Sequence, residues 1–120
     1  MTKVLISQLD GTALNWAVAK CEGYPVRLES LRNRIFILNG ASFSTEWAKG
    51  GPIIEKEGIH IGRKDGYWAA QCLPNCPYME GPSPLVAAMR CLVASKCKEE
   101  FVEVPDELIE APLEIERQRG

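Results

Sequence analysis

The five cysteines and the single histidine are the side chains of this 120-residue sequence best suited to metal or redox chemistry. Cys72 and Cys76 are four positions apart, and Cys91 and Cys97 are six apart within a predicted helix. Structural zinc prefers four ligands in two close pairs, but a separation of six puts two side chains on different faces of a helix. The redox motif has only two residues between its cysteines. We therefore predict inert buried thiols and no cofactor, with Cys72 and Cys76 as weak zinc candidates.

Acid–base and nucleophilic chemistry have equally few candidates. His60 alternates with Ile59 and Ile61, which is typical of a residue on the surface of a strand. The chain has no G-x-S-x-G motif, and no glycine-rich stretch ends in the Gly-Lys-Ser/Thr of a phosphate-binding loop. Glu55 and Glu57 would share a face of a strand and could bind a divalent ion or move a proton, although a solvated strand face is the commoner case. The sequence favours a protein that is not an enzyme.

The segment STEWAKGGPIIE, residues 44–55, has an unusual density of helix-ending residues. We interpret it as a switch from helix to strand. A short helix or turn begins at residues 44–45, and Gly50 takes the position after its end, where a positive φ is common. Gly51 and Pro52 then end the helix, and Ile53-Ile54 enters the core.

Two residues of this segment are not needed for such a switch. Trp47 is large for a loop edge, and Glu55 stands where the predicted strand begins. If they flank a cleft, then Trp47, the backbone of Gly50 and Gly51, and Glu55 form a rim that faces a ligand or a partner protein.

Arg90 completes the set of candidate site residues. It is the only charged residue between Leu85 and Ala94 of a helix predicted at 84–96, where Ser83 is the N-cap and proline follows it. Because this helix is apolar all round, we expect it to be buried on two sides, by another helix or by a second subunit in a homo-oligomer. A buried Arg90 needs an anion. We favour an internal carboxylate such as Glu55 over an anionic ligand.

The other elements follow from cap and turn signals. A strand or extended lead-in at 4–9 precedes a helix with Asp10 as N-cap and Gly23 after its end, in which Trp16 either contacts a second layer or is exposed. Two strand-like pieces lie near 25–29 and 34–38, with a turn at 39–40. A hairpin at 59–72 turns at Asp65-Gly66, a proline-rich loop covers 72–84, and an edge strand with a helical turn covers 102–108.

Several motifs occur together in one order: LDGTALNWAVAKCEG, FSTEWAKGGPIIE, the isolated Trp68, GPSPLVAAMRCLVASK and FVEVPDEL. In combination they resemble the NinX-like family of small phage and prophage proteins of unknown function, over residues 4–109. The resemblance implies a phage genetic setting in a bacterium. It implies no reaction.

Charge and hydropathy narrow the possible partners. The net charge is −2, with eight acidic and no basic residues from Glu99 to Glu116. The preceding part is only mildly basic, and the cluster of Arg27, Arg32 and Arg34 is interpreted as solvated, so we expect no nucleic-acid partner. No apolar run suits a membrane span and the N-terminus does not resemble a signal peptide, so we expect a cytoplasmic protein of the bacterial host.

The sequence therefore predicts one α+β domain at 1–109, an α/β sandwich with helices packed on a small, mostly antiparallel sheet. The acidic tail at 110–120 is expected to be disordered. The leading functional hypothesis is a phage accessory protein that binds a host or phage protein or a small anionic ligand without catalysis. The alternatives are a metal- or nucleotide-dependent enzyme of phage nucleic-acid metabolism and a sponge for an anionic signalling molecule.

Overall fold

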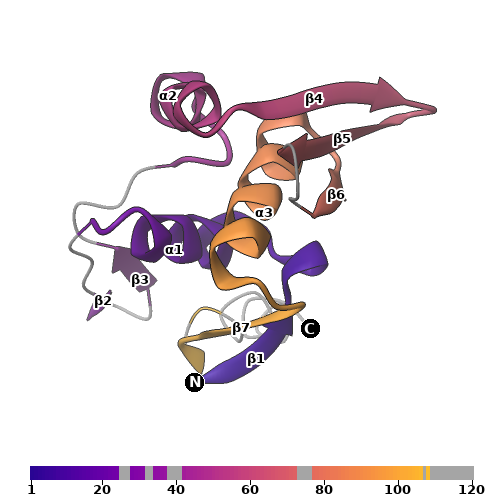
Figure 1. Ribbon diagram of the computed structural model, residues 1–120. Coiled ribbons are helices and arrows are strands. Elements are labelled where there is room, and N and C mark those ends of the chain that lie inside the picture. Colours follow the sequence, from indigo (N-terminus) through magenta and orange to yellow (C-terminus); the bar gives the residue numbers. More distant parts are fainter. Residues whose placement is uncertain (25–27, 32–33, 38–41, 73–76, 107, 109–120) are drawn as a thin grey trace.

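The computed structural model describes residues 1–24, 28–31, 34–37, 42–72, 77–106 and 108 (Figure 1). In chain order its elements are β1 (Thr2–Leu5), the 3-10 helix η1 (Ile6–Gln8), α1 (Gly11–Cys21), β2 (Leu28–Leu31), β3 (Arg34–Ile37), α2 (Trp47–Glu57), β4 (Ile59–Lys64), β5 (Tyr67–Cys72), β6 (Tyr78–Gly81), α3 (Pro84–Cys97) and β7 (Phe101–Val104). The described strands pair as β1–β7, β2–β3 and β4–β5–β6, always antiparallel. The predicted α+β class is confirmed.

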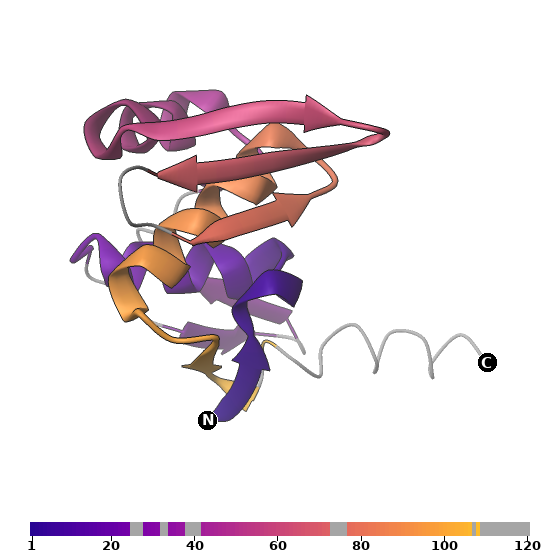
Figure 2. The ribbon, with the colours of Figure 1, turned by 45° about the vertical axis from the view of Figure 1, so that its right-hand side comes forward.

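Helix α3 is the central element of the core. It begins as predicted, because Ser83 Oγ accepts a hydrogen bond from the N–H of Val86 at 3.2 Å and Pro84 is the first helical residue. Figures 1 and 2 show α3 between the β4–β5–β6 sheet and α1, and it packs against both. All of its residues from Leu85 to Ala94 are buried except Arg90. The expected burial on two sides is confirmed, and α1 of the same chain supplies the second cover.

The three-stranded sheet starts from the predicted hairpin of β4 and β5. Asp65 and Gly66 both have positive φ, at 29° and 88°, as a type I′ turn requires. Ile61, Ala70 and Met79 lie side by side across the three strands and pack against the core. Strand β6 is a correction, because its residues belong to the stretch that we expected to be a loop. An edge strand needs backbone partners on one side only, so it tolerates nearby prolines.

The predicted switch from helix to strand at residues 44–55 is wrong. Helix α2 runs through residues 50–52 and ends at Glu57. The residue after it, Gly58, has the left-handed φ of 69°, and its N–H donates to Ile54 O at 3.0 Å. Gly58 is therefore the left-handed residue that follows the helix end, a position that we predicted for Gly50.

Tertiary packing explains why α2 continues through a proline. Pro52 is exposed in the second turn, where it lacks only the one N–H that would bond to Ala48 O. On the next residues of the helix, Ile53 is buried and Ile54 packs against the core. Burial of an apolar helix face supplies more stability than intrinsic propensity, so this face offsets the missing hydrogen bond.

Helix α1 is confirmed, with one difference at its start. Asp10 is the N-cap residue, but its side chain makes no capping hydrogen bond. Gly23 has the expected positive φ of 80° just after the helix. Trp16 is 8% exposed, so it contacts the interior layer. The segment before α2 docks on α1, because the N–H and hydroxyl of Ser44 both donate to Asn15 Oδ1, at 3.0 and 2.9 Å.

The two ends of the described chain meet in the β1–β7 ribbon, where Thr2 pairs with Val104. The amino group of Met1 lies 3.3 Å from Asp106 Oδ1, and the hydroxyl of Thr2 donates to the same carboxylate. The extended lead-in is thus a strand followed by η1, and the predicted edge strand begins one residue early, at Phe101.

Strands β2 and β3 fall within or beside the two strand-like pieces expected there. The turn at 39–40, Arg27, Arg32, Cys76 and the tail at 110–120 lie outside the described residues. Within the described part, no helix is long and apolar enough to cross a bilayer.

Candidate ligand-binding site

Arg90 bridges two other elements from the side of α3. Its Nε donates to Leu9 O, just after η1, at 2.6 Å, and its Nη1 donates to Glu80 O, on β6, at 2.7 Å. A guanidinium carries five N–H donors, and within the part of the chain that the structure describes these two hydrogen bonds use two of them. Arg90 therefore fastens the segment after η1 to the edge of the sheet and still has hydrogen-bonding capacity.

The electrostatic partner of Arg90 differs from the prediction. Glu55 is exposed on α2, and no ion pair joins Arg90 to a carboxylate among the residues that the structure describes. The expected Arg90–Glu55 pair is wrong because Glu55 lies on a helix whose other face packs inward. Burial lowers the pKa of Arg90, and the negative charge of Asp10 opposes this shift. Arg90 nevertheless stays charged at neutral pH.

A hollow of about 670 Å³ lies beside Arg90. Its walls come from η1, the start of β5, the edge strand β6 and α3. The lining residues are Ser7, Gln8, Tyr67, Tyr78, Met79, Glu80, Gly81 and Arg90. Hydroxyl and amide groups therefore surround the one guanidinium, which is the small set of convergent polar groups typical of a ligand pocket.

The two tyrosines of this hollow lead to a carboxylate. A hydrogen bond with Tyr78 is the main cause that raises the pKa of Tyr67. Desolvation and then a hydrogen bond with Glu80 raise the pKa of Tyr78. The ammonium of Lys64 lies 5.7 Å from the centre of the Tyr78 ring. The hollow thus contains a cation at Arg90 and an anion at Glu80, to which the tyrosine hydroxyls are linked.

Trp47 lies in a second hollow, of about 250 Å³, where the first turns of α2 and α3 meet. Its side chain is 55% exposed, and Ser44, Thr45, Ser83, Pro84 and Leu85 complete the lining. Pro84 and Arg90 are six residues apart on α3, or about 9 Å along its axis. The two hollows share no lining residue. The structure therefore separates Trp47 from Arg90, and the other predicted rim residues, Gly50, Gly51 and Glu55, line neither hollow.

Gly50 and Gly51 have packing roles inside α2. A Cβ on Gly50 would lie 2.5 Å from Phe43 O and 2.7 Å from a methyl carbon of Leu85, so only glycine permits this approach. A Cβ on Gly51 would lie 3.9 Å from a ring carbon of Trp47, which is an ordinary contact distance. Gly51 precedes a proline, where the absence of a Cβ relieves the clash that disfavours helical backbone. Packing and backbone geometry therefore account for both glycines.

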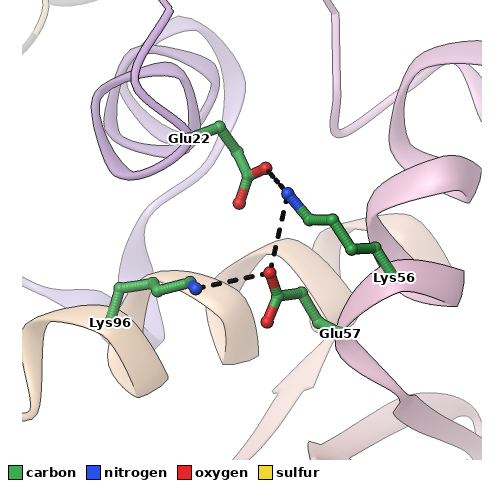
Figure 3. A network of polar contacts seen from close by, with 4 residues as sticks. All are labelled: Glu22, Lys56, Glu57 and Lys96. Carbon is green, nitrogen blue, oxygen red and sulfur yellow. Dashed lines mark hydrogen bonds and ion pairs between the residues drawn. The ribbon is translucent and has the colours of Figure 1, made fainter.

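Glu55 and Glu57 do not share a face, since residues two apart on a helix point in different directions. Instead, Glu57 belongs to a network that joins α1, α2 and α3 (Figure 3). Lys56 Nζ contacts the Glu22 carboxylate and lies 3.7 Å from Glu57 Oε2, which is 3.3 Å from Lys96 Nζ. The Glu22 side chain is only 4% exposed. This geometry removes the reason to regard Glu55 and Glu57 as paired catalytic carboxylates.

The metal candidates are only partly within the described residues. Cys72 is buried at the end of β5, and Cys76 lies outside the described residues. His60 is exposed on β4, as expected for a strand surface. Within the described ranges, no group of three or more His, Cys, Asp or Glu side chains is arranged to hold a metal ion.

A family model described as Bacteriophage P22, NinX matches residues 5–96. The chain belongs to this NinX family. The match confirms the resemblance given by the sequence motifs, and it includes every residue that lines the two hollows. It ends before β7, so the motif FVEVPDEL lies outside it. No curated protein shows a significant match to the chain.

Sequence reasoning found Arg90 but not the residues around it. Tyr78 and Glu80 were missed because their strand was assigned to a loop, and Ser7 and Gln8 because a 3-10 turn carries no strong pattern. The available signal was Tyr67, a large side chain directly after the Asp65-Gly66 turn.

Proposed function

We propose that this phage-family protein is a non-catalytic binding protein that holds a small anionic ligand in the Arg90 hollow. The observation that supports this proposal is that the Arg90 guanidinium makes no ion pair with a carboxylate among the described residues. Arg90 is half-buried beside a space of about 670 Å³, and its hydrogen bonds within the described residues go to two neutral carbonyl groups. Hydrogen bonds between a guanidinium and an anion are roughly twice as strong as those between neutral groups, so an anion is the natural further partner.

Glu80 sets a second requirement for the ligand. Its carboxylate interacts with the side chain of Tyr78, which lines the same hollow, and would repel a bare anion. A molecule with an anionic group near Arg90 and an N–H or O–H donor near Glu80 would satisfy both charges. Tyr67 and Tyr78 add aromatic surface to the same walls. The hollow therefore suits a small organic anion with donor groups better than an inorganic one, and a mononucleotide is a suitable probe of this class.

Thermal unfolding of the wild type with phosphate, sulfate and a set of mononucleotides tests the proposal. A ligand that binds only the folded state raises Tm in a concentration-dependent way. We expect at least one nucleotide to raise Tm in the wild type and not in Arg90→Met. Lys49→Met, which removes a cation from a different hollow, is the control and should keep the shift. A nucleotide shift that persists in Arg90→Met would contradict the proposal, as would no shift with any probe.

A protein partner at Trp47 is the second candidate function, and the exposure of this side chain favours it. Trp47 is 55% exposed beside the hollow at the starts of α2 and α3, and tryptophan is enriched at the energetic centres of protein interfaces. Affinity capture with the wild type and Trp47→Ser from phage-infected cells tests this idea. A partner supports it only if the Trp47→Ser protein, folded to the same extent, fails to retain that partner.

The other hypotheses rank below these two. A sponge for an anionic signalling molecule is a special case of anion binding at Arg90, so the same melts test it. An enzyme has less support, because Glu55 and Glu57 lie two residues apart on a helix and so point in different directions.

A further inference from the structure

Cys21 and Cys97 stand at matching ends of two packed helices. Cys21 is the last residue of α1 and Cys97 the last residue of α3, and the two helices contact each other in the core. Both side chains are partly buried and pack against the central cluster. The Cys97 side chain is close enough to Cys21 to be its hydrogen-bond partner. Residues 76 positions apart in the sequence are thus brought together by the fold.

The residue that follows Cys21 and the residue that precedes Cys97 take part in one chain of ion pairs. Glu22 and Lys96 belong to the network of Figure 3, in which Lys56 and Glu57 of α2 connect them. The cysteine pair therefore lies beside a chain of ion pairs that links the C-terminal ends of α1 and α3 through α2.

We infer that Cys21 and Cys97 form a redox modification site, which a small disulfide such as oxidised glutathione converts into an intramolecular disulfide bond. The structure shows the reduced form, in which both thiols are free. Closure would link the C-terminal ends of α1 and α3 covalently. This inference is independent of ligand binding at Arg90.

The reaction is an ordinary thiol–disulfide exchange in two steps. The Cys97 thiolate attacks one sulfur of the small disulfide, forms a mixed disulfide and releases the first small thiolate. Cys21 then loses its proton to solvent, and its sulfur attacks the Cys97 sulfur and releases the second small thiolate. The two protein thiols lose two electrons in total, and the small disulfide is reduced to two thiols.

The environment of Cys21 makes closure slow at neutral pH. Burial, the neighbouring Cys97 and the charge of Glu22 raise the pKa of Cys21 to about 12, and Lys96 acts in the opposite direction. The thiolate is the nucleophile, and little of Cys21 is in this form at neutral pH. We therefore expect disulfide formation to need a high concentration of the oxidant or a long incubation. The bond should then be stable, because a crosslink over a long loop restricts the unfolded chain.

The test is peptide mapping of the full chain after incubation with oxidised glutathione, followed by alkylation of the remaining thiols. We expect the wild type to lose two of its five thiols, to retain no glutathione, and to yield a linked peptide pair containing Cys21 and Cys97. Its Tm should rise and return to the original value with dithiothreitol. Five intact thiols after prolonged oxidation would overturn the inference, and so would a linked pair without Cys21 and Cys97.

Two variants separate closure from general oxidation. In Cys21→Ser, Cys97 can form the mixed disulfide but has no neighbour to resolve it, so we expect a stable glutathione adduct at Cys97. In the double variant Cys21→Ser/Cys97→Ser, oxidation should leave Tm unchanged. A rise in Tm on oxidation of the double variant would assign the effect to other cysteines and contradict the inference. The wild-type peptide map remains decisive if either variant folds poorly.

Discussion

At the scale of single residues, the chemistry of this protein depends on polar groups that are incompletely satisfied or held close together. Arg90 donates to two backbone carbonyl groups and lies beside a hollow. Cys21 is kept as a thiol by burial and by its neighbour Cys97. Each case gives a stability prediction that one substitution can test.

Arg90→Met should lower the free energy of unfolding by about 1–3 kcal/mol in the absence of ligand. The variant removes two hydrogen bonds from a charged donor and leaves the carbonyl groups of Leu9 and Glu80 without that donor. Urea unfolding measures the change, and Arg90→Lys, which keeps the charge but not the planar fork, should recover only part of it. An Arg90→Met protein as stable as the wild type would show that the guanidinium contributes nothing to the unliganded fold.

The stability conferred by Cys21 should depend on pH above its ordinary pKa. The pKa of Cys21 is raised from 9.0 to about 12 in the folded chain. Below pH 9 both states keep the proton and the contribution is complete. Between pH 9 and about 12 the unfolded chain releases the proton first, so stability falls by at most about 1.4 kcal/mol per pH unit.

Urea unfolding with reductant at pH 8 and pH 10 measures this loss. Cys21→Ser is the control because serine does not titrate in this range. We expect the wild type to lose more stability than the variant over the interval. Equal losses in the two proteins would mean that Cys21 titrates alike in the folded and unfolded chains.

At the scale of elements, α2 depends on a close approach that only glycine permits. The Cβ of Gly50→Ala would overlap Phe43 O and Leu85, and overpacking of this kind costs about 1–3 kcal/mol. Gly51→Ala is the matched control, because its Cβ meets only an ordinary contact with Trp47, and its change should stay within about 1 kcal/mol. Thermal melts compare the two. Equal losses would contradict the packing role of Gly50.

The sequence predicted those elements whose signals are local. Ser83 and Pro84 at the start of α3, Asp65-Gly66 in the hairpin and Gly23 after α1 act through their own backbone or nearest turn, so they were visible without a structure. Helix α2 and strand β6 were misread because contacts outside their own segments decide them. Gly50 packs closely against Phe43 and Leu85, and β6 forms by pairing with β5.

The same limit applies to the candidate site. Arg90 was found because one charge in an apolar helix is unusual in any fold. Its hydrogen-bond partners come from the residue after η1 and from β6, which lie far apart in the sequence and meet only in the folded protein. The pair of Cys21 and Cys97 was not predicted for the same reason.

At the scale of the whole molecule, α3 is the centre of a core that one chain completes. The sheet covers one side of this helix and α1 covers another (Figure 2). The homo-oligomer proposed from the apolar helix is therefore not needed to bury α3, and self-association would have to use another surface. The exposed Trp47 is the best candidate in the described part of the chain.

Sedimentation equilibrium of the wild type and Trp47→Ser at high micromolar concentration tests that assignment. We expect any wild-type dimer to dissociate in the variant, because Trp47 supplies exposed apolar area without supporting the core. A dimer that persists in Trp47→Ser would exclude this surface. A wild type that is monomeric throughout would remove the homo-oligomer proposal.

The most direct test of the central claim is an NMR titration of the uniformly ¹⁵N-labelled wild type with the mononucleotide that gives the largest Tm shift. If the Arg90 hollow binds the anion, saturable shift changes will cluster on the amides of Ser7, Gln8 and β6 and on Nε of Arg90, and Arg90→Met will abolish them. Saturable changes that instead cluster around Lys49 and Lys56, or changes that do not saturate, would contradict the claim.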